Sequence, residues 1–112
     1  MLNDCVNVHN RNRQRYAEIF KLAEELAERD VEFELKVVAM DGLKKCYLYY
    51  PDRFRRIALI VQGTGTHGNE DGLLQIDGLM YPEEEEKSED GTLGWLTAGN
   101  VLERILKKEA ER

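Results

Sequence analysis

The sequence has only two cysteines, Cys5 and Cys46, and no apolar run that approaches the length of a membrane span. Two cysteines do not make the dense disulfide framework of small secreted domains, and we expect both to be free thiols. A membrane-spanning helix needs roughly 20 consecutive apolar residues. The first residues also lack the basic and then apolar pattern of a signal peptide. These absences predict a cytoplasmic protein that does not contact a membrane.

An excess of basic residues is also missing, because the formal net charge is −6. Affinity for phosphate backbones comes mainly from clustered lysine and arginine, so this charge argues against direct binding to DNA or RNA. The charges are nevertheless unevenly distributed along the chain. Arginines gather at Arg53, Arg55 and Arg56, whereas residues 83–90 are strongly acidic. The sequence therefore predicts a basic pole and an acidic pole.

Hydrophobic periodicity predicts an α+β fold. Apolar residues at three- and four-residue steps between Tyr16 and Ala27 indicate an amphipathic helix that begins near Asn10 or Asn12. Alternating or continuous apolar residues then predict four strands, and Thr97 is a suitable cap for a final helix. The predicted strands cover residues 31–37, 43–50, 54–62 and 73–80, the third of them central, and the final helix is expected to bury Val101, Leu102, Ile105 and Leu106.

Short connections between these elements favour antiparallel neighbours. We therefore expect residues 1–112 to form one domain, a two-layer sandwich with the order helix, four-stranded antiparallel meander, helix. Both helices would cover one face of the sheet, and part of the tyrosine set Tyr47, Tyr49 and Tyr50 would lie on an open face, available for self-association. Residues 1–10 are predicted to be flexible, and residues 82–92 to be an acidic linker.

A glycine-rich segment follows the most apolar strand. Its first part, Gly63 to Gly68, has the spacing of the dinucleotide-binding fingerprint, but that motif needs a helix at its third glycine, and residues 69–78 lack helical periodicity. Alternating glycines can still expose backbone N–H groups as an anion-binding nest. The alternative is that the glycines only permit the positive φ angles of a long hairpin connection. The predicted site for a phosphate-bearing ligand comprises Arg55, Arg56, Gly63, Thr64, Gly65, Thr66, His67 and Asn69.

His67 lies close in sequence to Glu70 and Asp71, a grouping that resembles an acid–base residue beside carboxylates. A solvated polar loop gives the same residues, so a small enzyme acting through His67 is a further alternative. Cys5 and His9 have a spacing that fits half of a zinc site, but no paired second half follows. No metal or cofactor is therefore expected.

The acidic segment contains four consecutive glutamates. Such a run imitates a nucleic-acid backbone when it enters a basic channel of a partner, although it is more often a solvated linker. Trp95 is expected to be a core anchor beneath the final helix, whereas a partly exposed tryptophan would be a binding hot spot. The candidate partner-binding residues are Glu83, Glu84, Glu85, Glu86 and Trp95.

Two stretches of the chain resemble small uncharacterised open reading frames of bacteriophages and mobile genetic elements of Firmicutes. The first is the box Gly68 to Ile76, and the second is the tail Gly94 to Ile105. The acidic stretch between them is also similar, although a histidine often occupies the position of Asn69 in that group. The resemblance carries over no activity and implies only a context, a short accessory protein that acts in the cytoplasm of a host cell.

Accessory proteins of this kind commonly counter host defence, by sequestering a nucleotide signal or by occupying a host protein. The first hypothesis is therefore a non-enzymatic homo-oligomer that sequesters a phosphate-bearing nucleotide at the glycine-rich segment, because a site between protomers encloses more of a ligand than one small sheet does. The alternative is an acidic inhibitor of the anti-CRISPR type, a nucleic-acid mimic that binds a host defence protein.

Overall fold

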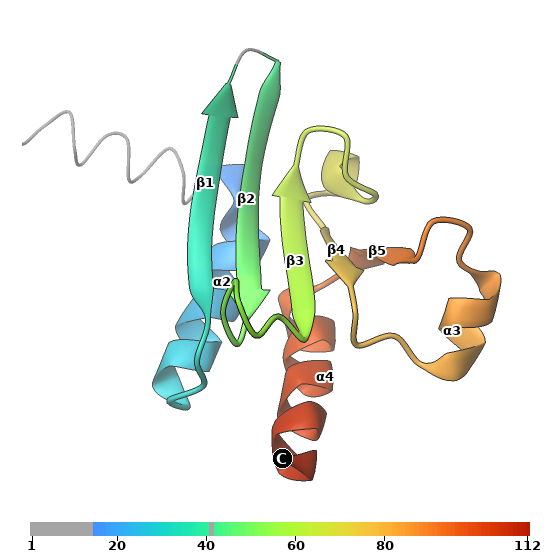
Figure 1. Cartoon of the computed structure of the whole chain (residues 1–112). Helices are drawn as coiled ribbons and strands as arrows, with labels where there is room; N and C mark the ends of the chain where they lie inside the picture. The colour runs from blue at the N-terminus through green and yellow to red at the C-terminus, as the bar shows by residue number, and fades with distance from the viewer. Residues whose placement is uncertain (1–14, 41) are drawn as a thin grey trace, which may run out of the picture.

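The computed structural model of the protein describes residues 15–40 and 42–112, and Figure 1 shows their arrangement. The helices are α2 (Ala17–Glu28), α3 (Pro82–Lys87) and α4 (Ala98–Glu111), and the 3₁₀ turn η1 covers Asn69–Asp71. The strands are β1 (Glu34–Met40), β2 (Leu43–Tyr50), β3 (Ala58–Gly63), β4 (Leu74–Asp77) and β5 (Thr92–Leu96).

The strands form one antiparallel sheet in the order β1-β2-β3-β4-β5, with β3 at its centre as predicted. The α+β class is confirmed, but the prediction of four strands is wrong, because β5 pairs with β4 as a fifth. Gly94 and the exposed Trp95 interrupt the apolar alternation of β5. A register irregularity between Leu74 and Ile76 of β4 lies opposite them. A short strand of this kind has no alternating pattern for a sequence analysis to detect.

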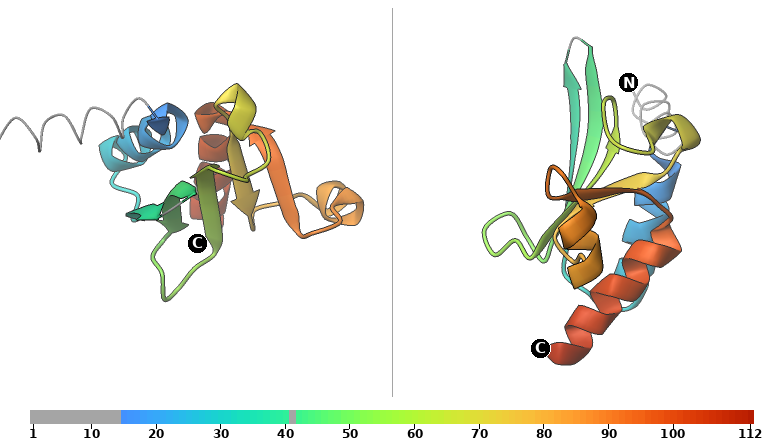
Figure 2. Two further views of the ribbon diagram at one scale, coloured as in Figure 1. Left: turned by 90° about the horizontal axis from the view of Figure 1, so that it is seen from above. Right: turned by 90° about the vertical axis from the view of Figure 1, so that its right-hand side faces the viewer.

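Both α2 and α4 lie against the same face of the sheet (Figure 2), and they pack against each other. Thr97 caps α4 as predicted, because its hydroxyl accepts a hydrogen bond from the Asn100 N–H at 3.1 Å. The buried apolar residues of α2 are Ile19, Leu22, Ala23 and Leu26, and those of α4 are Ala98, Val101 and Ile105. The sheet contributes Cys46, Leu48, Tyr50, Ala58, Ile60, Leu74, Ile76 and Leu96 to the same core. Leu102 and Leu106, also predicted to be buried, are half-buried.

Two polar side chains fasten the helices to the rest of the fold. The first turn of α2 lacks a side-chain cap of its own, and the buried Gln62 of β3 accepts the Ile19 N–H at 3.0 Å. The amide of Gln62 also donates to the Gly72 carbonyl at 3.2 Å. Conversely, the Glu18 carboxylate of α2 accepts the Ala98 N–H of α4 at 2.6 Å. The bonds accepted by Gln62 and Glu18 satisfy backbone N–H groups that have no partner inside their own helix.

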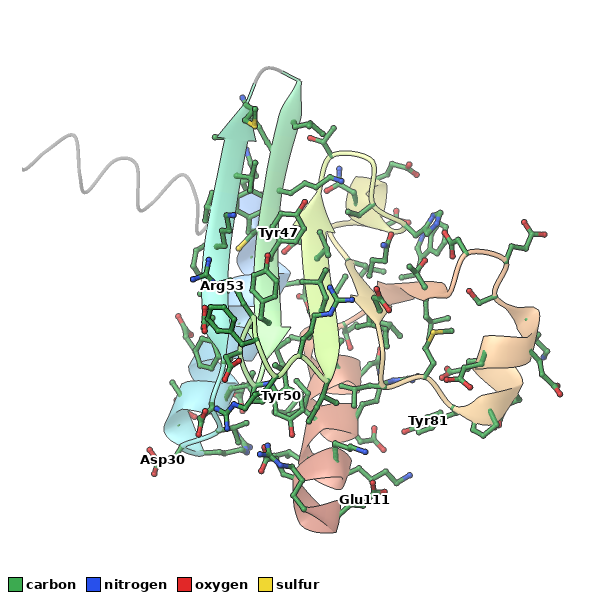
Figure 3. All side chains as sticks on the ribbon, in the orientation of Figure 1. Asp30, Tyr47, Tyr50, Arg53, Tyr81 and Glu111 are labelled. Atoms are coloured by element: carbon green, nitrogen blue, oxygen red, sulfur yellow. The ribbon has the colours of Figure 1, made fainter. Side chains whose placement is uncertain are left out.

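The other face of the sheet is open, and residues 51–57, which connect β2 to β3, project from it (Figure 2). Tyr47 and Tyr49 lie on this face with their ring centres 6.2 Å apart. Tyr50 instead points toward the helices, where it is fully buried and donates a hydrogen bond to Glu109 Oε1 at 2.7 Å. Tyr47 and Tyr50 are labelled in Figure 3. The open face thus carries part of the tyrosine set, as predicted.

Residues 82–92, predicted to be a linker, contain the helix α3, which has no buried residue. Charge attaches it to α4, because Arg104 donates two hydrogen bonds to the Glu84 carboxylate at 2.7 and 2.8 Å. Arg104 also donates to the Leu79 carbonyl at 3.0 Å and lies 4.4 Å from the centre of the Tyr81 ring. Within this arm of residues 82–92, helix α3 is therefore held to the body of the protein by one arginine, a mode of attachment that does not depend on an apolar stripe.

Cys46 is fully buried in β2, as expected for a small core residue. Burial raises the pKa of its thiol to about 12, so almost no thiolate exists at mildly alkaline pH. In a Cys5→Ser variant, which removes the other thiol of the chain, we expect Cys46 to resist a colorimetric thiol reagent until a denaturant unfolds the protein. Complete labelling of the native variant within minutes would contradict this burial.

Residues 1–14 and 41 lie outside the described part of the chain. The predicted flexible segment 1–10, the helix start at Asn10 or Asn12 and the pair Cys5 and His9 belong to this part. Among the residues that the structure does describe, no helix has both the length and the apolar character needed to cross a bilayer.

Candidate functional site

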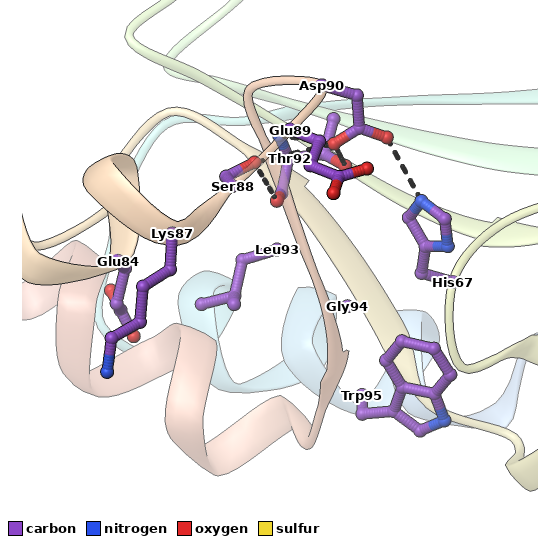
Figure 4. A pocket seen from close by; sticks show the side chains of 10 residues that line it. All are labelled: His67, Glu84, Lys87, Ser88, Glu89, Asp90, Thr92, Leu93, Gly94 and Trp95. Carbon is purple, nitrogen blue, oxygen red and sulfur yellow. Dashed lines mark hydrogen bonds and ion pairs between the residues drawn. The ribbon is translucent and has the colours of Figure 1, made fainter.

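A cleft of about 490 Å³ lies between β5, α3 and His67 of the connection between β3 and β4 (Figure 4). This volume is within the range of small-molecule sites. Its apolar and aromatic lining comes from Leu93, Gly94, Trp95 and His67. The polar lining comes from Glu84, Lys87, Ser88, Glu89, Asp90 and Thr92. Strand β5 and the arm that carries α3 therefore build most of the cleft.

His67 and Asp90 meet in this cleft although they are far apart in sequence, and His67 Nε2 lies 3.0 Å from Asp90 Oδ2. The other carboxylate oxygen of Asp90 accepts the Thr92 hydroxyl at 2.7 Å and the Thr92 N–H at 3.1 Å. The Thr92 hydroxyl and the His67 ring hold the pKa of Asp90 well below its ordinary value. Asp90 is thus a fixed negative charge that orients the imidazole ring.

Trp95 is 55% exposed, so the prediction of a core anchor beneath the last helix is wrong. Its indole stacks on the His67 ring with centroids 5.8 Å apart and an angle of 21° between the planes. Its backbone has a φ of +57°, a left-handed conformation that bulky residues rarely adopt. A backbone conformation of this kind costs free energy of folding. Residues that adopt it cluster at functional sites. Trp95 is therefore both half-exposed and held in an unfavourable backbone conformation.

Two glycines permit the close approach that brings His67 and Trp95 together. Gly68 has a φ of +95°, and a Cβ atom there would lie 2.8 Å from the Trp95 backbone nitrogen. A Cβ atom at Gly94 would overlap the His67 Cβ and lie 2.7 Å from the His67 carbonyl oxygen. The His67 N–H is held from the other side by the Gln75 side chain at 2.8 Å. The loop and β5 are consequently in direct backbone contact.

Ser88, Asp90 and His67 are neighbours, but their order does not suit nucleophilic catalysis. The Ser88 hydroxyl donates to the Thr92 carbonyl at 2.8 Å and lies 3.4 Å from Asp90 Oδ1. A serine nucleophile needs the histidine within hydrogen-bonding reach, and here the carboxylate stands between the two. The cleft therefore offers a flat aromatic wall with carboxylates around it.

The two arginines predicted to bind phosphate are not brought to the glycine-rich segment. They precede β3, whereas Gly63 ends it (Figure 1), and six residues of extended strand separate the two regions by about 20 Å. Arg55 is paired with Asp52 at 2.7 Å and with Glu32. Arg56 makes a longer contact with Asp77 at 3.4 Å. The arginines and the glycine-rich segment are thus close in sequence, but they lie at opposite ends of β3.

The glycine-rich segment uses most of its own hydrogen-bond donors. The N–H groups of Thr64, Thr66 and Asn69 donate to backbone carbonyls at 3.0 to 3.2 Å. Both threonine hydroxyls donate to carbonyls as well, at 3.3 Å for Thr64 and 2.7 Å for Thr66. Gly63 and Gly65 have positive φ angles, as a hairpin connection requires, and only the short turn η1 follows where a dinucleotide site needs a helix. Of the ligand-binding residues predicted here, His67 alone lines the cleft.

The predicted partner-binding glutamates divide into two groups. Glu84 faces the body of the protein, where Arg104 binds it. Glu83, Glu85 and Glu86 are exposed on α3. The arm therefore presents three of the four consecutive carboxylates to solvent.

Several cleft residues were not predicted, among them Lys87, Asp90, Leu93 and Gly94. Asp90 was grouped with a solvated acidic run, and its contact with His67 depends on the β4–β5 hairpin. One local signal was available in the pair Gly94 and Trp95. A glycine inside a strand often marks a close approach of another backbone.

Within residues 15–40 and 42–112, no three histidine, cysteine, aspartate or glutamate side chains gather in a way that would hold a metal ion. Compared with protein-family models, with curated proteins and with solved structures, the chain matches none of them.

Proposed function

We propose that this is a non-enzymatic binding protein whose cleft holds the flat heteroaromatic part of a nucleotide-like ligand. The observation that carries the proposal is Trp95, a half-exposed indole on the wall of the cleft, fixed by a left-handed backbone and by the His67 ring. The exposed part of the ring adds nothing to folding, and strain in the backbone opposes folding. Recognition of a ligand accounts for both.

A nucleobase suits this cleft in two respects. Stacking of a base on an aromatic side chain contributes about 1–3 kcal/mol, and the indole offers such a surface. Carboxylates accept hydrogen bonds from the amino and ring N–H groups of a base. Glu89 is an exposed carboxylate of the cleft, whereas Asp90 is already bound by Thr92 and His67.

The phosphates of such a ligand would lie outside the cleft. Glu84, Glu89 and Asp90 repel an anion, and the residues that line the cleft include one lysine, Lys87, and no arginine. This arrangement differs from the phosphate nest predicted for the glycine-rich segment. In the cleft the protein would bind the base of the ligand and not its phosphate. We therefore expect a nucleoside to bind nearly as tightly as the corresponding nucleotide.

Fluorescence provides the direct test, because the chain has a single tryptophan. Titration with a panel of nucleosides, mononucleotides and cyclic oligonucleotides is expected to quench Trp95 in a saturable way for at least one base. His67→Ala should weaken that ligand about tenfold, by loss of one stacking partner.

Arg56→Ala is the matched control for this titration, because Arg56 is also exposed but lies at the far end of β3. Its affinity for the ligand should stay within about twofold of the unmodified protein. Absence of quenching across the whole panel, or equal losses in both variants, would remove the support for the proposal.

The biological role that we propose for this binding is the sequestration of a nucleotide signal of host defence, in line with the resemblance to phage accessory proteins. Inhibition of a host protein by the acidic arm is a separate proposal, supported by the exposure of Glu83, Glu85 and Glu86. The two differ in salt dependence, because an exposed acidic surface loses affinity for a basic partner as salt rises. Stacking in an aromatic cleft is much less sensitive to salt.

One observation favours acid–base catalysis as a second function. Asp90 orients His67 through Nε2, and an imidazole held by a carboxylate is the usual form of a general base. Prolonged incubation with the ligand that quenches Trp95, followed by mass analysis, separates the two functions. Unchanged ligand supports sequestration, and conversion that disappears in His67→Ala supports an enzyme.

A further inference from the structure

Most hydrogen-bond donors among the side chains of the cleft are already used within the protein. The Thr92 hydroxyl donates to Asp90 at 2.7 Å, and the Ser88 hydroxyl donates to the Thr92 carbonyl at 2.8 Å. His67 Nε2 lies 3.0 Å from Asp90. Because an ionised carboxylate can only accept, the Nε2 atom carries a proton and directs it to Asp90. These three donors are therefore not available to a ligand.

Two other donors, the Lys87 ammonium and the Trp95 indole N–H, point away from the acidic end of the cleft, which is formed by Glu89 and Asp90. Figure 4 shows Lys87 on the far side of Leu93 from Trp95. The indole N–H lies on the edge of the Trp95 ring that is turned away from the two carboxylates (Figure 4). The acidic end of the cleft is thus a place for acceptors.

Glu89 is the acceptor at this end that a ligand can engage fully. It lines the cleft and is exposed, and among the residues that the structure describes it has no hydrogen-bond or ion-pair partner. Because no contact fixes it, the side chain can turn toward a ring stacked on Trp95 without breaking another bond. A ligand that donates hydrogen bonds would be held here, whereas an acceptor would be repelled.

The common nucleobases differ in the donors that they present side by side. Guanine offers two adjacent donors, the N1–H and the N2 amino group, and a carboxylate accepts such a pair with its two oxygens in parallel. Adenine, cytosine and uracil each place an acceptor next to the donor on the corresponding edge. With these bases one oxygen of Glu89 would lose its partner and would face the lone pair of the base. Guanine is therefore the base that matches the acidic end of the cleft.

We infer that the cleft selects guanine, with the base stacked on Trp95 and its N1–H and N2 amino group bound by the Glu89 carboxylate. The inference rests on the proposed function, because it names the base of the nucleotide-like ligand. Stacking supplies affinity for any base, since every base has an aromatic face. The carboxylate supplies the choice between bases, because only guanine satisfies both of its oxygens.

Nucleosides test this selectivity without any contribution from phosphate. Guanosine is expected to quench Trp95 with about tenfold higher affinity than inosine, which lacks the N2 amino group, or 1-methylguanosine, which lacks the N1–H. Adenosine, cytidine and uridine should bind no more tightly than inosine. Equal affinities for guanosine and inosine would overturn the inference.

Glu89→Gln replaces one acceptor oxygen of this side chain by an amide that donates. This change should lower the affinity for guanosine about tenfold, and the affinity for adenosine should stay equal or rise. The reason is that a glutamine amide pairs with the adjacent donor and acceptor of adenine. Since Glu89 is exposed and unpaired, the substitution removes no contact that supports the fold.

Glu86→Gln is the matched control, because it removes the same charge from an exposed glutamate of α3 that is not part of the cleft lining. Its affinity for guanosine should stay within about twofold of the unmodified protein. Equal losses in the two variants would mean that only the overall negative charge matters, and they would overturn the role of Glu89.

The same titrations distinguish failure of this inference from failure of the proposed function. Saturable quenching by several nucleosides with similar affinities would overturn the selectivity for guanine and sustain the stacking site. Preference for a different base would also overturn the inference and assign the acidic end to that base. Absence of quenching by every nucleoside would remove the stacking site and the inference together.

Discussion

Replacement of Gly94 by alanine is expected to destabilise the protein by about 1–3 kcal/mol, the range of overpacked sites. The new methyl group would overlap the Cβ of His67 and lie 2.7 Å from its carbonyl oxygen. Part of this contact is with backbone, which cannot rotate away as a flexible side chain does. Relief requires β5 to separate from the loop, and this separation would break the stacking of His67 on Trp95.

Urea unfolding followed by far-ultraviolet circular dichroism measures this loss, and the emission of Trp95 reports the local change in the same samples. Gly99→Ala is the control, because Gly99 lies in α4 with nothing nearer to its added Cβ than the Thr97 hydroxyl at 3.8 Å. That change should be neutral or stabilise by up to about 1 kcal/mol, through helix propensity. Equal stabilities for the two variants would contradict the close contact at Gly94.

Arg104→Leu is expected to destabilise the protein by about 2–3 kcal/mol and to release the arm that carries α3. The change leaves the half-buried Glu84 without its partner and removes the bond to the Leu79 carbonyl. Because α3 buries no apolar residue, no other strong contact of that helix compensates. Hydrogen exchange of residues 82–92 should rise well before global unfolding.

Arg29→Leu is the control for this experiment. Arg29 also pairs with a glutamate, at 2.6 Å, but both side chains are about 40% exposed. Exposed pairs contribute about 0–1 kcal/mol, so this variant should stay close to the unmodified protein. If Arg29→Leu and Arg104→Leu cost the same, or if exchange in residues 82–92 is unchanged, the arm is not held by Arg104.

The pair of Glu84 and Arg104 also has a defined effect on acid stability. The hydrogen bonds from Arg104 lower the pKa of Glu84 below its ordinary value of 4.5. A lowered pKa means that the stabilisation is complete above that value and is lost as the pH falls through the folded-state pKa. Arg104→Leu should therefore flatten this part of the acid unfolding curve.

The core of the fold was predictable because its elements repeat a simple pattern. The spacing of Ile19, Ala23 and Leu26 predicted α2, and the apolar run in β3 predicted a central strand. The strand β5 and the attachment of α3 were not predictable in this way. One depends on a glycine that accommodates a distant loop, and the other depends on an arginine about twenty residues away in sequence.

The candidate site was predictable only in part. His67 was singled out beside Glu70 and Asp71, whereas its partner in the structure is Asp90. Arg55 and Arg56 were placed with the glycine-rich segment because they are near it in sequence, but an extended strand carries the chain away from its starting point. Local patterns report which residues share a face, and they do not report which loops meet beyond the ends of strands.

The order of the strands in the sheet has a consequence for folding during translation. Each strand follows its spatial neighbour in the chain, so pairing can proceed strand by strand as the chain emerges. The apolar stripe of α2 must wait longer, because its partner α4 is the last of these elements to be synthesised. During translation α2 therefore depends on the growing sheet, or on a chaperone, to keep Leu22 and Leu26 from other nascent chains.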